Sequence, residues 1–347
     1  MPPLERRIVV GRRLVPSYSK IVEKSEHDHY MTELRARLGC PPSQFPTCNP
    51  VGLDRKTLKR IRAQDYQATL KSDGVQHVLV LTTRPGSTYD RPLPVALMID
   101  RASQMHEVDV CATEDYFLKG TVLDGELVAQ QPEEDCLLYL VFDCMYLRGE
   151  RLGHRPFTER IAAARGAVVE PGDAADVDDV VEDCDGVAMV AFAPRIAMRV
   201  KSFVDTVHAC RLWRDREQQD HRVDGLVLQH LREPYRAGTA RNLAILKWKF
   251  APTVDLVGVP PQLRVREGPL PATLLGRRVT HAADGGVMAE GEDDVYEYAL
   301  DASDDEVRLL PLRSRPDKTT PNALRVVEAT LGEVLAAITP EELSAAS

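Results

Sequence analysis

The sequence predicts an α+β protein in which a first domain of short strands and helices is followed by a small β-barrel. From about residue 66 the chain consists mainly of short runs rich in β-branched and apolar residues, with a helical segment at 158–169 among them. After residue 253, five further short runs are separated by turns rich in Gly, Asp and Pro, a pattern typical of a small barrel. Beyond Asn322, apolar residues recur every three to four positions, which predicts a final helix with one packed face.

The individual elements follow from the same patterns. A first helix is expected over 27–39, ending at Gly39, and a proline-rich loop that no helix could cross follows it over 40–52. The strands expected in the first domain are 66–70, 75–83, 93–101, 223–230 and 244–250. The strands expected in the barrel are 254–259, 263–267, 272–281, 295–300 and 307–313. The acidic stretch 170–186 is interpreted as a solvated surface element.

Composition excludes several classes of protein. The chain has 347 residues and a formal charge of −9, which argues against a wholly basic nucleic-acid coat but leaves room for a locally basic cleft. Its seven cysteines are irregularly spaced and form no CxxC pair, as expected for reduced intracellular thiols. The N-terminal segment has no apolar core typical of a secretory signal, and no run is long enough for a membrane helix. We therefore expect a soluble intracellular protein without a membrane partner.

A lysine between two predicted strands is the first candidate for chemistry. Lys71 opens the text Lys-Ser-Asp-Gly, between the runs 66–70 and 75–83. One interpretation is an exposed turn residue. The other is a nucleophile that attacks an α-phosphate and forms a phosphoamide, which requires the neutral amine and hence a lowered pKa, supplied by neighbouring cations and partial desolvation.

A pair of acids lies in the strand-like text Thr121–Val128. Because side chains alternate along a strand, Asp124 and Glu126 project to one side with Gly125 between them. A hairpin turn at Asp-Gly is one explanation. The functional alternative is that the carboxylates bind ribose hydroxyls or a divalent metal.

Three further texts add aromatic, acidic and basic candidates. Phe142 belongs to a buried-strand text and is either plain core or a base-stacking ring. Asp224 precedes a glycine and an apolar strand. Lys247 and Lys249 share one face of a strand, either as protection of a sheet edge or as a phosphate-facing pair beside a domain boundary.

The order of these texts is more specific than any one of them. The series KxDG, DGE, FD, DGL and KxK resembles the lysine nucleotidyltransferase superfamily of capping guanylyltransferases and DNA and RNA ligases, over roughly residues 66–338. The resemblance implies a nucleotidyltransferase domain of the ATP-grasp-like, ligase type, with antiparallel sheets and helices, and a C-terminal OB-fold barrel. The implied boundaries are 1–250 (with 1–65 as a helical and irregular N-terminal part), 251–318 for the barrel, and 319–347 for a C-terminal helix that packs back on the first domain.

Two texts favour the capping enzymes over the ligases. Residues 313–322 resemble the capping motif RxRxDKxxPN, and LKWKF resembles the capping form of the fifth motif. The chain departs from the family at Gln76, where an arginine is usual. Its divergence and its lack of further motif sets resemble the stand-alone capping enzymes of large DNA viruses, which would place it in the host nucleus or cytoplasm.

The resemblance implies an mRNA guanylyltransferase that moves GMP from GTP, through a covalent Lys71–GMP intermediate, to the 5′ diphosphate end of RNA, forming the GpppN cap. It implies Mg²⁺ or Mn²⁺ as cofactor, held by Glu126 and Asp224, and an RNA triphosphatase, a cap methyltransferase and RNA polymerase as partners. The alternatives are an ATP-dependent DNA or RNA ligase, or a catalytically inactive nucleotide- or RNA-binding module. Besides the nucleophile Lys71, the residues that the resemblance assigns to the nucleotide are Asp73, Gly74, Arg101, Glu126, Phe142, Lys201, Asp224, Lys247, Lys249, Arg313, Arg315, Asp317 and Lys318.

Overall fold

The chain divides into two compact units, one formed by residues 1–51 and 63–246 and the other by residues 52–62 and 247–347. The computed structural model describes residues 7–10, 13–16, 20–21, 23–42, 44–59, 61, 65–88, 90–131, 137–169, 186–189, 196–237, 244–258, 260–281, 293–315 and 318–346. The predicted acidic surface element lies almost wholly outside these residues, which include only its last position, Gly186.

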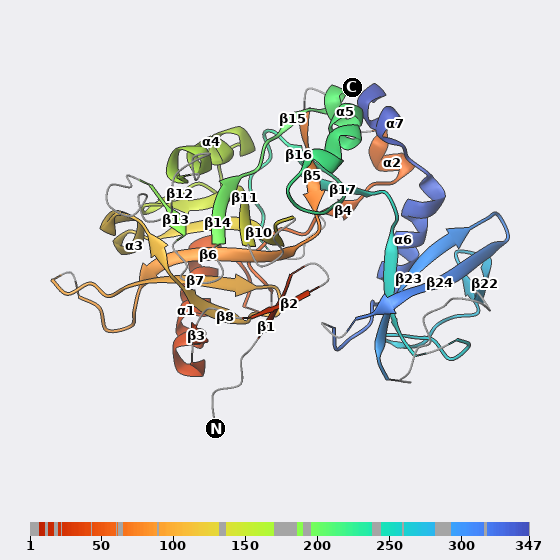
Figure 1. Ribbon diagram of the computed structural model, residues 1–347, viewed down its shortest axis with the longest axis horizontal. Helices are drawn as coiled ribbons and strands as arrows, with labels where there is room; N and C mark the ends of the chain where they lie inside the picture. Colours follow the sequence, from red (N-terminus) through yellow and green to blue (C-terminus); the bar gives the residue numbers. More distant parts are fainter. Residues whose placement is uncertain are drawn as a thin grey trace. The chain divides into compact units, whose positions relative to one another are not determined.

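An eight-stranded sheet is the centre of the first unit (Figure 1). Its order is β12-β11-β10-β6-β7-β8-β3, with β14 paired to β11. Only the β11–β14 pair among these is parallel. The strands are β3 (Lys20–Ile21), β6 (Val75–Thr83), β7 (Pro94–Asp100), β8 (Met105–Val108), β10 (Thr121–Ala129), β11 (Leu137–Leu147), β12 (Glu150–Arg151) and β14 (Ile196–Val200).

Helices cover both faces of this sheet (Figure 1). They are α1 (Lys24–Leu38) on one face, and α3 (Glu114–Leu118) and α4 (Phe157–Ala167) on the other. Successive residues of β6 alternate between the two cores: Val78 and Val80 pack with α1, whereas Leu79 and Leu81 pack with α3 and α4. Because both faces are buried, the strand reads as a continuous apolar run and not as an alternating one.

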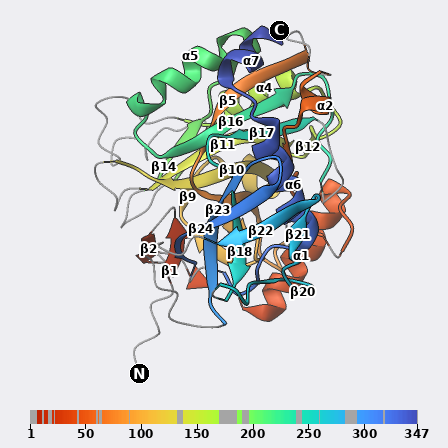
Figure 2. The same cartoon turned by 90° about the vertical axis from the view of Figure 1, so that its right-hand side faces the viewer.

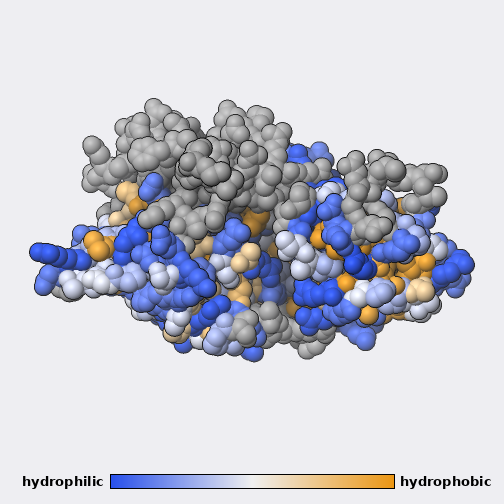
Figure 3. All heavy atoms as spheres, turned by 90° about the horizontal axis from the view of Figure 1, so that it is seen from below, coloured by the Kyte–Doolittle hydropathy of each residue, from blue (hydrophilic) through white to orange (hydrophobic). Residues whose placement is uncertain are grey.

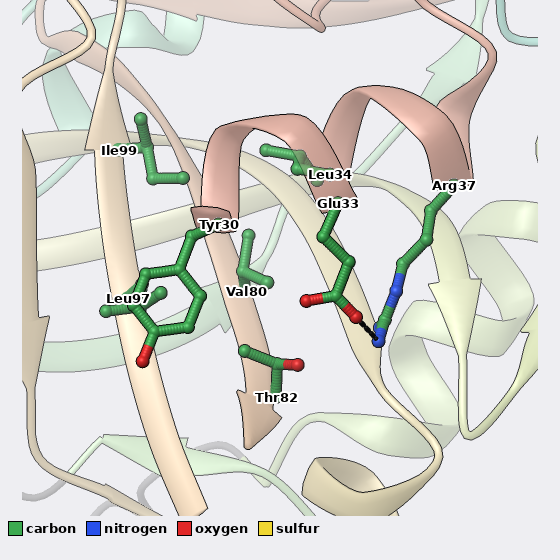
Figure 4. Close-up of a pocket in the computed structure, with 8 residues that line it drawn as sticks. All are labelled: Tyr30, Glu33, Leu34, Arg37, Val80, Thr82, Leu97 and Ile99. Atoms are coloured by element: carbon green, nitrogen blue, oxygen red, sulfur yellow. Dashed lines mark hydrogen bonds and ion pairs between the residues drawn. The ribbon is translucent and has the colours of Figure 1, made fainter. Parts of the chain in front are cut away.

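The contact of α1 with the sheet shows how the predicted first helix is held. Tyr30 and Leu34 of α1 lie over Val80, Leu97 and Ile99 of the sheet (Figure 4). The helix ends where predicted, since Gly39 caps it in the left-handed conformation with φ +66°.

A second group of strands in the first unit carries the Lys71 text. In it β5 (Tyr66–Ser72) lies between β15 (Val204–Asp205) and β16 (Val223–His230), antiparallel to both. The chain passes into the second unit along β17 (Ile245–Lys249). The remaining elements of the first unit are β1 (Arg7–Val10), β2 (Arg13–Pro16), β9 (Val110–Cys111), β13 (Ala188–Met189), η3 (Thr206–His208), α5 (Ala209–Arg214) and η4 (Asp215–Gln218).

The second unit is built on a curled seven-stranded sheet of order β20-β19-β18-β23-β24-β22-β21, which fits the predicted OB-fold (Figure 2). Its inner face buries apolar residues such as Leu256, Tyr298 and Leu309. The strands are β18 (Thr253–Val257), β19 (Arg264–Val265), β20 (Gly268–Pro269), β21 (Thr273–Leu274), β22 (Arg277–His281), β23 (Val295–Ala302) and β24 (Glu306–Ser314). All five predicted barrel strands are present, which confirms the α+β class.

The C-terminal helices lie in this second unit. Val327 and Leu331 of α6 (Leu324–Ala336) join the apolar core of the seven-stranded sheet. The same C-terminal segment also contacts β17, since Trp248 Nε1 donates to the Ile338 carbonyl at 2.7 Å. The apolar stripe of α6 is used to cover the sheet of its own unit. Residues 52–62 also belong to the second unit, and β4 (Val51–Gly52) and α2 (Arg55–Leu58) lie at the start of this segment. Within the unit, Arg55 Nε donates a hydrogen bond to the Ala336 carbonyl at 2.6 Å. The last helix is α7 (Pro340–Ala345).

The surface of the described residues is mainly hydrophilic on the face shown in Figure 3, with apolar side chains showing among the hydrophilic ones. Large exposed apolar residues are Leu93, Val207, Phe250, Leu275, Leu312 and Val326. Among the described residues, no helix has the length and apolar character needed to cross a membrane.

Candidate active site

Lys71 is the next-to-last residue of β5 and forms an ion pair with a predicted acid. Its Nζ atom lies 2.8 Å from Asp224 Oδ1 on the neighbouring strand β16. The register of β5 and β16 pairs Ser72 with Val223 and Lys71 with Gly225, so that Asp224 is the extra residue of a bulge. A bulge re-aims the side chain that it contains. Here it directs a carboxylate at the candidate nucleophile.

A second lysine, Lys201, is more deeply buried and lies just after β14. Its Nζ atom is 3.4 Å from Glu126 Oε2 and 3.2 Å from the Leu70 carbonyl oxygen, and its side chain is only 7% exposed. The same ammonium lies 5.9 Å from the centroid of the Phe142 ring. The structure thus brings together four residues that the sequence predicts for the site, Lys71, Asp224, Glu126 and Lys201, with Phe142 beside them.

Phe142 owes its position to a second bulge. In the pairing of β10 with β11, Asp124 faces Asp143 and Gly125 faces Val141, which leaves Phe142 as the extra residue. Its ring is only partly buried, in contrast to Val141 and Asp143 on either side. A partly exposed ring beside an ammonium is suited to stacking on a base.

The charges around Lys71 shift its pKa in the direction opposite to our expectation. Burial acts to lower the pKa of Lys71, but the carboxylates of Asp224, Glu126 and Asp73 together raise it above its ordinary value. In Lys201 the balance is reversed, because burial and the nearby charge of Lys71 lower its pKa although Glu126 acts to raise it. The prediction that the site itself lowers the pKa of Lys71 is therefore wrong for the nucleotide-free protein: Lys71 is held as an ammonium ion.

Two carboxylates of the site suit a divalent metal that arrives with a nucleotide. Asp224 and Glu126 both act on the charge of Lys71, so that both carboxylates lie near its ammonium group. Within the described part of the chain, no group of three or more His, Cys, Asp or Glu side chains is arranged to hold a metal. Mg²⁺ is usually bound by one or two carboxylates together with substrate phosphates and water. Asp224 and Glu126 fit this kind of site.

Gly74 and Gly125 are required by close approach. A Cβ atom on Gly74 would lie 2.4 Å from the Leu127 carbonyl oxygen and 2.9 Å from Cγ of Glu126. A Cβ atom on Gly125 would lie 2.5 Å from the Tyr139 ring. Gly74 therefore lets the turn after Lys71 pack directly on the strand that carries Glu126, and Asp73 secures this turn through a 2.8 Å bond from its amide to the Arg222 carbonyl.

A buried carboxyl lies next to this strand face. Asp124 is fully buried and accepts hydrogen bonds from Tyr235 Oη at 2.7 Å and Gln76 Nε2 at 3.0 Å. Burial raises the pKa of Asp124 to about 7, even though both hydrogen bonds act to lower it. Gln76 pairs with Glu126 in the register, so that Asp124, Gln76 and Glu126 share a face, as predicted for the two acids. Gln76, at the position where the family usually has arginine, thus serves to satisfy a buried acid.

Arg101 directly follows β7 and lies near this group. Its guanidinium contacts Asn49 Oδ1 and lies close enough to Asp124 to act on its pKa. The structure therefore associates Arg101 with the Asp124 group of the site.

The remaining predicted cations belong to the second unit and have acidic partners there. Lys247 Nζ lies 3.9 Å from Glu333 Oε1 on α6. Burial raises the pKa of Glu333, and the charges of Lys247 and Lys249 act to lower it. Along β17 the buried residues Leu246 and Trp248 alternate with the two lysines, which confirms that Lys247 and Lys249 share a face.

The cations of the RxRxDK text are also paired. Arg313 Nε lies 2.5 Å from Glu297 Oε2, and Arg315 Nη1 lies 3.0 Å from Asp255 Oδ1. Lys318 also contacts Asp255. Asp317 lies outside the described residues. Sequence reasoning missed Asp255 and Glu297, since acids that alternate with apolar residues on a strand carry no motif of their own.

Comparisons with known proteins agree with the motif order. Residues 13–251 match the family described as mRNA capping enzyme, catalytic domain. Among similar proteins, the mRNA-capping enzyme subunit alpha of Schizosaccharomyces pombe is 25% identical over 90% of this chain and 82% of its own length. The subunit alpha of Yarrowia lipolytica is 27% identical over 60% of this chain and 52% of its own, and the mRNA-capping enzyme of Danio rerio is 24% identical over 60% and 33%.

Against the first relatives matched, the chain spans about half of their length or less. Among solved structures, a mycobacterial DNA ligase D complexed with ATP and MES is 13% identical, covers 79% of this chain and 95% of its own, and has a TM-score of 0.42. The family match covers more than half of the chain and includes Lys71, Glu126, Lys201 and Asp224. The chain therefore belongs to the family of mRNA capping enzyme catalytic domains.

Proposed function

We propose that this protein is an mRNA guanylyltransferase that transfers GMP from GTP through a covalent Lys71–GMP intermediate to the 5′ diphosphate end of RNA, forming the GpppN cap. The observation that carries the proposal is the Lys71–Asp224 ion pair in a chain of the capping family, with Lys201, Glu126 and Phe142 around it. This arrangement offers a nucleophilic amine, acids next to it, a second cation and a ring for the base.

In the first step, Lys71 Nζ attacks the α-phosphorus of GTP, a P–N bond forms, and the bond to pyrophosphate breaks. Lys71 must lose a proton first, and Asp224 Oδ1, at 2.8 Å, is placed to accept it. Lys201 is a second cation of the site, and its pKa is lowered mainly by burial. Because Lys201 pairs with Glu126, it competes only weakly with Lys71 for the carboxylate of Asp224. Phe142 stacks on the base and orients the nucleotide. Positioning of this kind supplies much of the catalytic effect in phosphoryl transfer.

A divalent Mg²⁺ or Mn²⁺ bound with the nucleotide would supply positive charge beside the phosphates, and Glu126 and Asp224 are the residues that would hold it. In the second step, a β-phosphate oxygen of the RNA end attacks the phosphorus of Lys71–GMP and the amine of Lys71 leaves. The remaining predicted residues contribute to nucleotide binding: Asp73, Gly74, Arg101, Lys247, Lys249, Arg313, Arg315, Asp317 and Lys318.

The reaction needs a diphosphate end as acceptor, which an RNA triphosphatase would supply, and its product is the substrate of a cap methyltransferase. We include both enzymes and RNA polymerase among the proposed partners, and we place the reaction inside the cell. The cysteines described as free, including the buried Cys40, Cys48 and Cys144, agree with a reducing compartment. A viral origin stays a prediction.

The deciding experiment is covalent labelling. The protein is incubated with Mg²⁺ or Mn²⁺ and α-labelled GTP or ATP, and the labelled band is treated with acid and alkali. We expect a GMP adduct that is labile in acid, stable in alkali and absent from Lys71→Ala. Preferential labelling by ATP would assign the chain to the ligases, no labelling by either nucleotide would favour an inactive binding module, and an adduct in Lys71→Ala would refute the nucleophile.

A further inference from the structure

A buried hydrogen-bonded chain begins at the residue next to Lys71. Ser72 Oγ lies 3.0 Å from His221 Nε2, and His221 Nδ1 lies 2.9 Å from Asp220 Oδ1. Ser72 is fully buried and His221 is 6% exposed, so neither side chain is open to a substrate. With its proton on Nδ1, His221 donates to Asp220 and accepts from the Ser72 hydroxyl, which uses both ring nitrogens.

The other oxygen of Asp220 joins two more strands. Asp220 Oδ2 lies 3.1 Å from Gln130 Nε2 and 3.1 Å from Arg199 Nη1. Gln130 directly follows β10, the strand of Glu126, and Arg199 lies on β14, which leads into Lys201. Although partial burial acts to raise it, the hydrogen bond from His221 and the charge of Arg199 lower the pKa of Asp220, so that this acid is a stable anion at the centre of the group.

Backbone bonds run parallel to these side-chain bonds. The Asp73 amide donates to the Arg222 carbonyl at 2.8 Å, and the Gln131 amide donates to the Asp220 carbonyl at 2.6 Å. Gln130 and His221 also form an antiparallel bridge. Residues 220–222 therefore hold the turn after Lys71 and the end of the Glu126 strand before the chain enters β16 with Asp224.

We name Ser72, Gln130, Arg199, Asp220 and His221 the His221 cluster. Each member lies one to four positions along the chain from one of the four side chains Lys71, Glu126, Lys201 and Asp224. Lys71 and Asp224 lie on neighbouring strands of one sheet, whereas Glu126 lies on β10 of the other sheet and Lys201 directly follows β14 of that sheet. The His221 cluster connects all four at one point.

We propose that Asp220 and His221 are positioning residues for guanylyl transfer, which set the distance between Lys71 and the acids and cation around it. The proposal rests on the proposed function. Because an error of about 1 Å in a reacting group can cost about a hundredfold in rate, loss of this connection lowers the rate of adduct formation more than it weakens GTP binding.

The kinetic test compares alanine substitutions at both positions with a conservative substitution at Asp220. In Asp220→Ala and His221→Ala we expect kcat for GMP-adduct formation to fall about 10- to 100-fold, with KM for GTP changed less than about threefold. Asp220→Asn keeps an oxygen that accepts from His221, and we expect it to recover most of the lost kcat. His106→Gln is the matched control, because His106 is a buried histidine (3% exposed) on β8. It should lower the melting temperature and leave kcat unchanged.

Two kinetic results would overturn the proposal: a kcat of His221→Ala equal to that of the wild type when both are fully folded, or a defect confined to KM. A measurement without substrate separates this failure from failure of the proposed function. In His221→Ala, hydrogen exchange of the intact chain should accelerate at the amides of Asp73 and Gln131 and stay unchanged in β7. Unaltered protection at both amides would refute the positioning role even if the wild type forms no adduct.

Discussion

Lys71 Nζ and Asp224 Oδ1 lie 2.8 Å apart although the two residues are separated by 153 positions in the chain. Both side chains are partly buried, at 20% and 29% exposure, so that solvent screens the pair only incompletely. The same carboxylate raises the pKa of Lys71 and is the nearest proton acceptor when Lys71 reacts. The ion pair therefore keeps Lys71, the proposed nucleophile, protonated in the protein without a nucleotide.

Replacing Asp224 by Asn should separate these two effects. Removing the negative charge lowers the pKa of Lys71 relative to the wild type, because Asp224 is the largest cause that raises it. Without nucleotide, Lys71 should then react with an amine-acetylating reagent at lower pH, as measured by mass spectrometry. GMP-adduct formation should fall by about a hundredfold, because a group used in the transition state is lost.

The control for this comparison is Asp115→Asn. Asp115 pairs with Lys119 at 2.7 Å, but both side chains are about half exposed, and exposed pairs interact weakly. The reactivity of Lys119 should hardly change. An unchanged acetylation profile of Lys71 in Asp224→Asn would contradict the assigned role of the ion pair.

Gly74→Ala tests the close approach between the turn after Lys71 and the Glu126 strand. The added Cβ atom would meet the Leu127 carbonyl at 2.4 Å, and backbone cannot yield as a flexible side chain can. We expect a loss of about 1 to 3 kcal/mol in the free energy of unfolding, together with loss of adduct formation. Gly166→Ala in α4 has no atom within 4 Å and should gain about 0.5 to 1 kcal/mol. Equal stability of the two variants would refute the packing argument.

Asp124 should make stability depend on pH. Its pKa rises from the ordinary 3.8 to about 7 on folding, so its contribution is fully present below the ordinary value and is lost as the pH rises through 7. Between about pH 5 and about pH 8, Asp124→Asn should therefore gain about 2 kcal/mol relative to the wild type in denaturant unfolding. Asp28→Asn, at a carboxylate that is 68% exposed, serves as the control and should track the wild type at every pH. A constant difference between Asp124→Asn and the wild type would show that Asp124 is ionised throughout.

Lys318→Ala should affect only the first chemical step. The capping-family resemblance assigns Lys318 to the pyrophosphate end of GTP, which is absent once Lys71–GMP has formed. Adduct formation should fall about a hundredfold, whereas transfer from the purified adduct to diphosphate-ended RNA should be nearly normal. Arg278→Ala, at a cation of the same unit whose side chain is 75% exposed, should leave both steps intact. Equal defects of Lys318→Ala in the two steps, or no defect, would refute the assignment.

Local patterns in the sequence were sufficient for most elements and for the family. The helix that ends at Gly39, the strand β6 and the helix α6 are where propensity and periodicity place them, whereas β5 runs two residues further than predicted and includes Lys71. They are predictable because a helix end, an apolar run and a turn depend on neighbouring residues. The motif order also determined the family, since five short texts in one order are a property of the chain alone.

Tertiary structure decided what depends on pairing between distant strands. Bulges aim Asp224 and Phe142 into the site, and their presence depends on the register with another strand. The upward shift in the pKa of Lys71 results from the sum of burial and three surrounding carboxylates, which no residue type reveals by itself. The packing of α6 was likewise decided by tertiary structure, because its apolar face covers the seven-stranded sheet. Sequence therefore fixes the inventory of reactive groups, whereas their distances and charges arise only when the strands are brought into register.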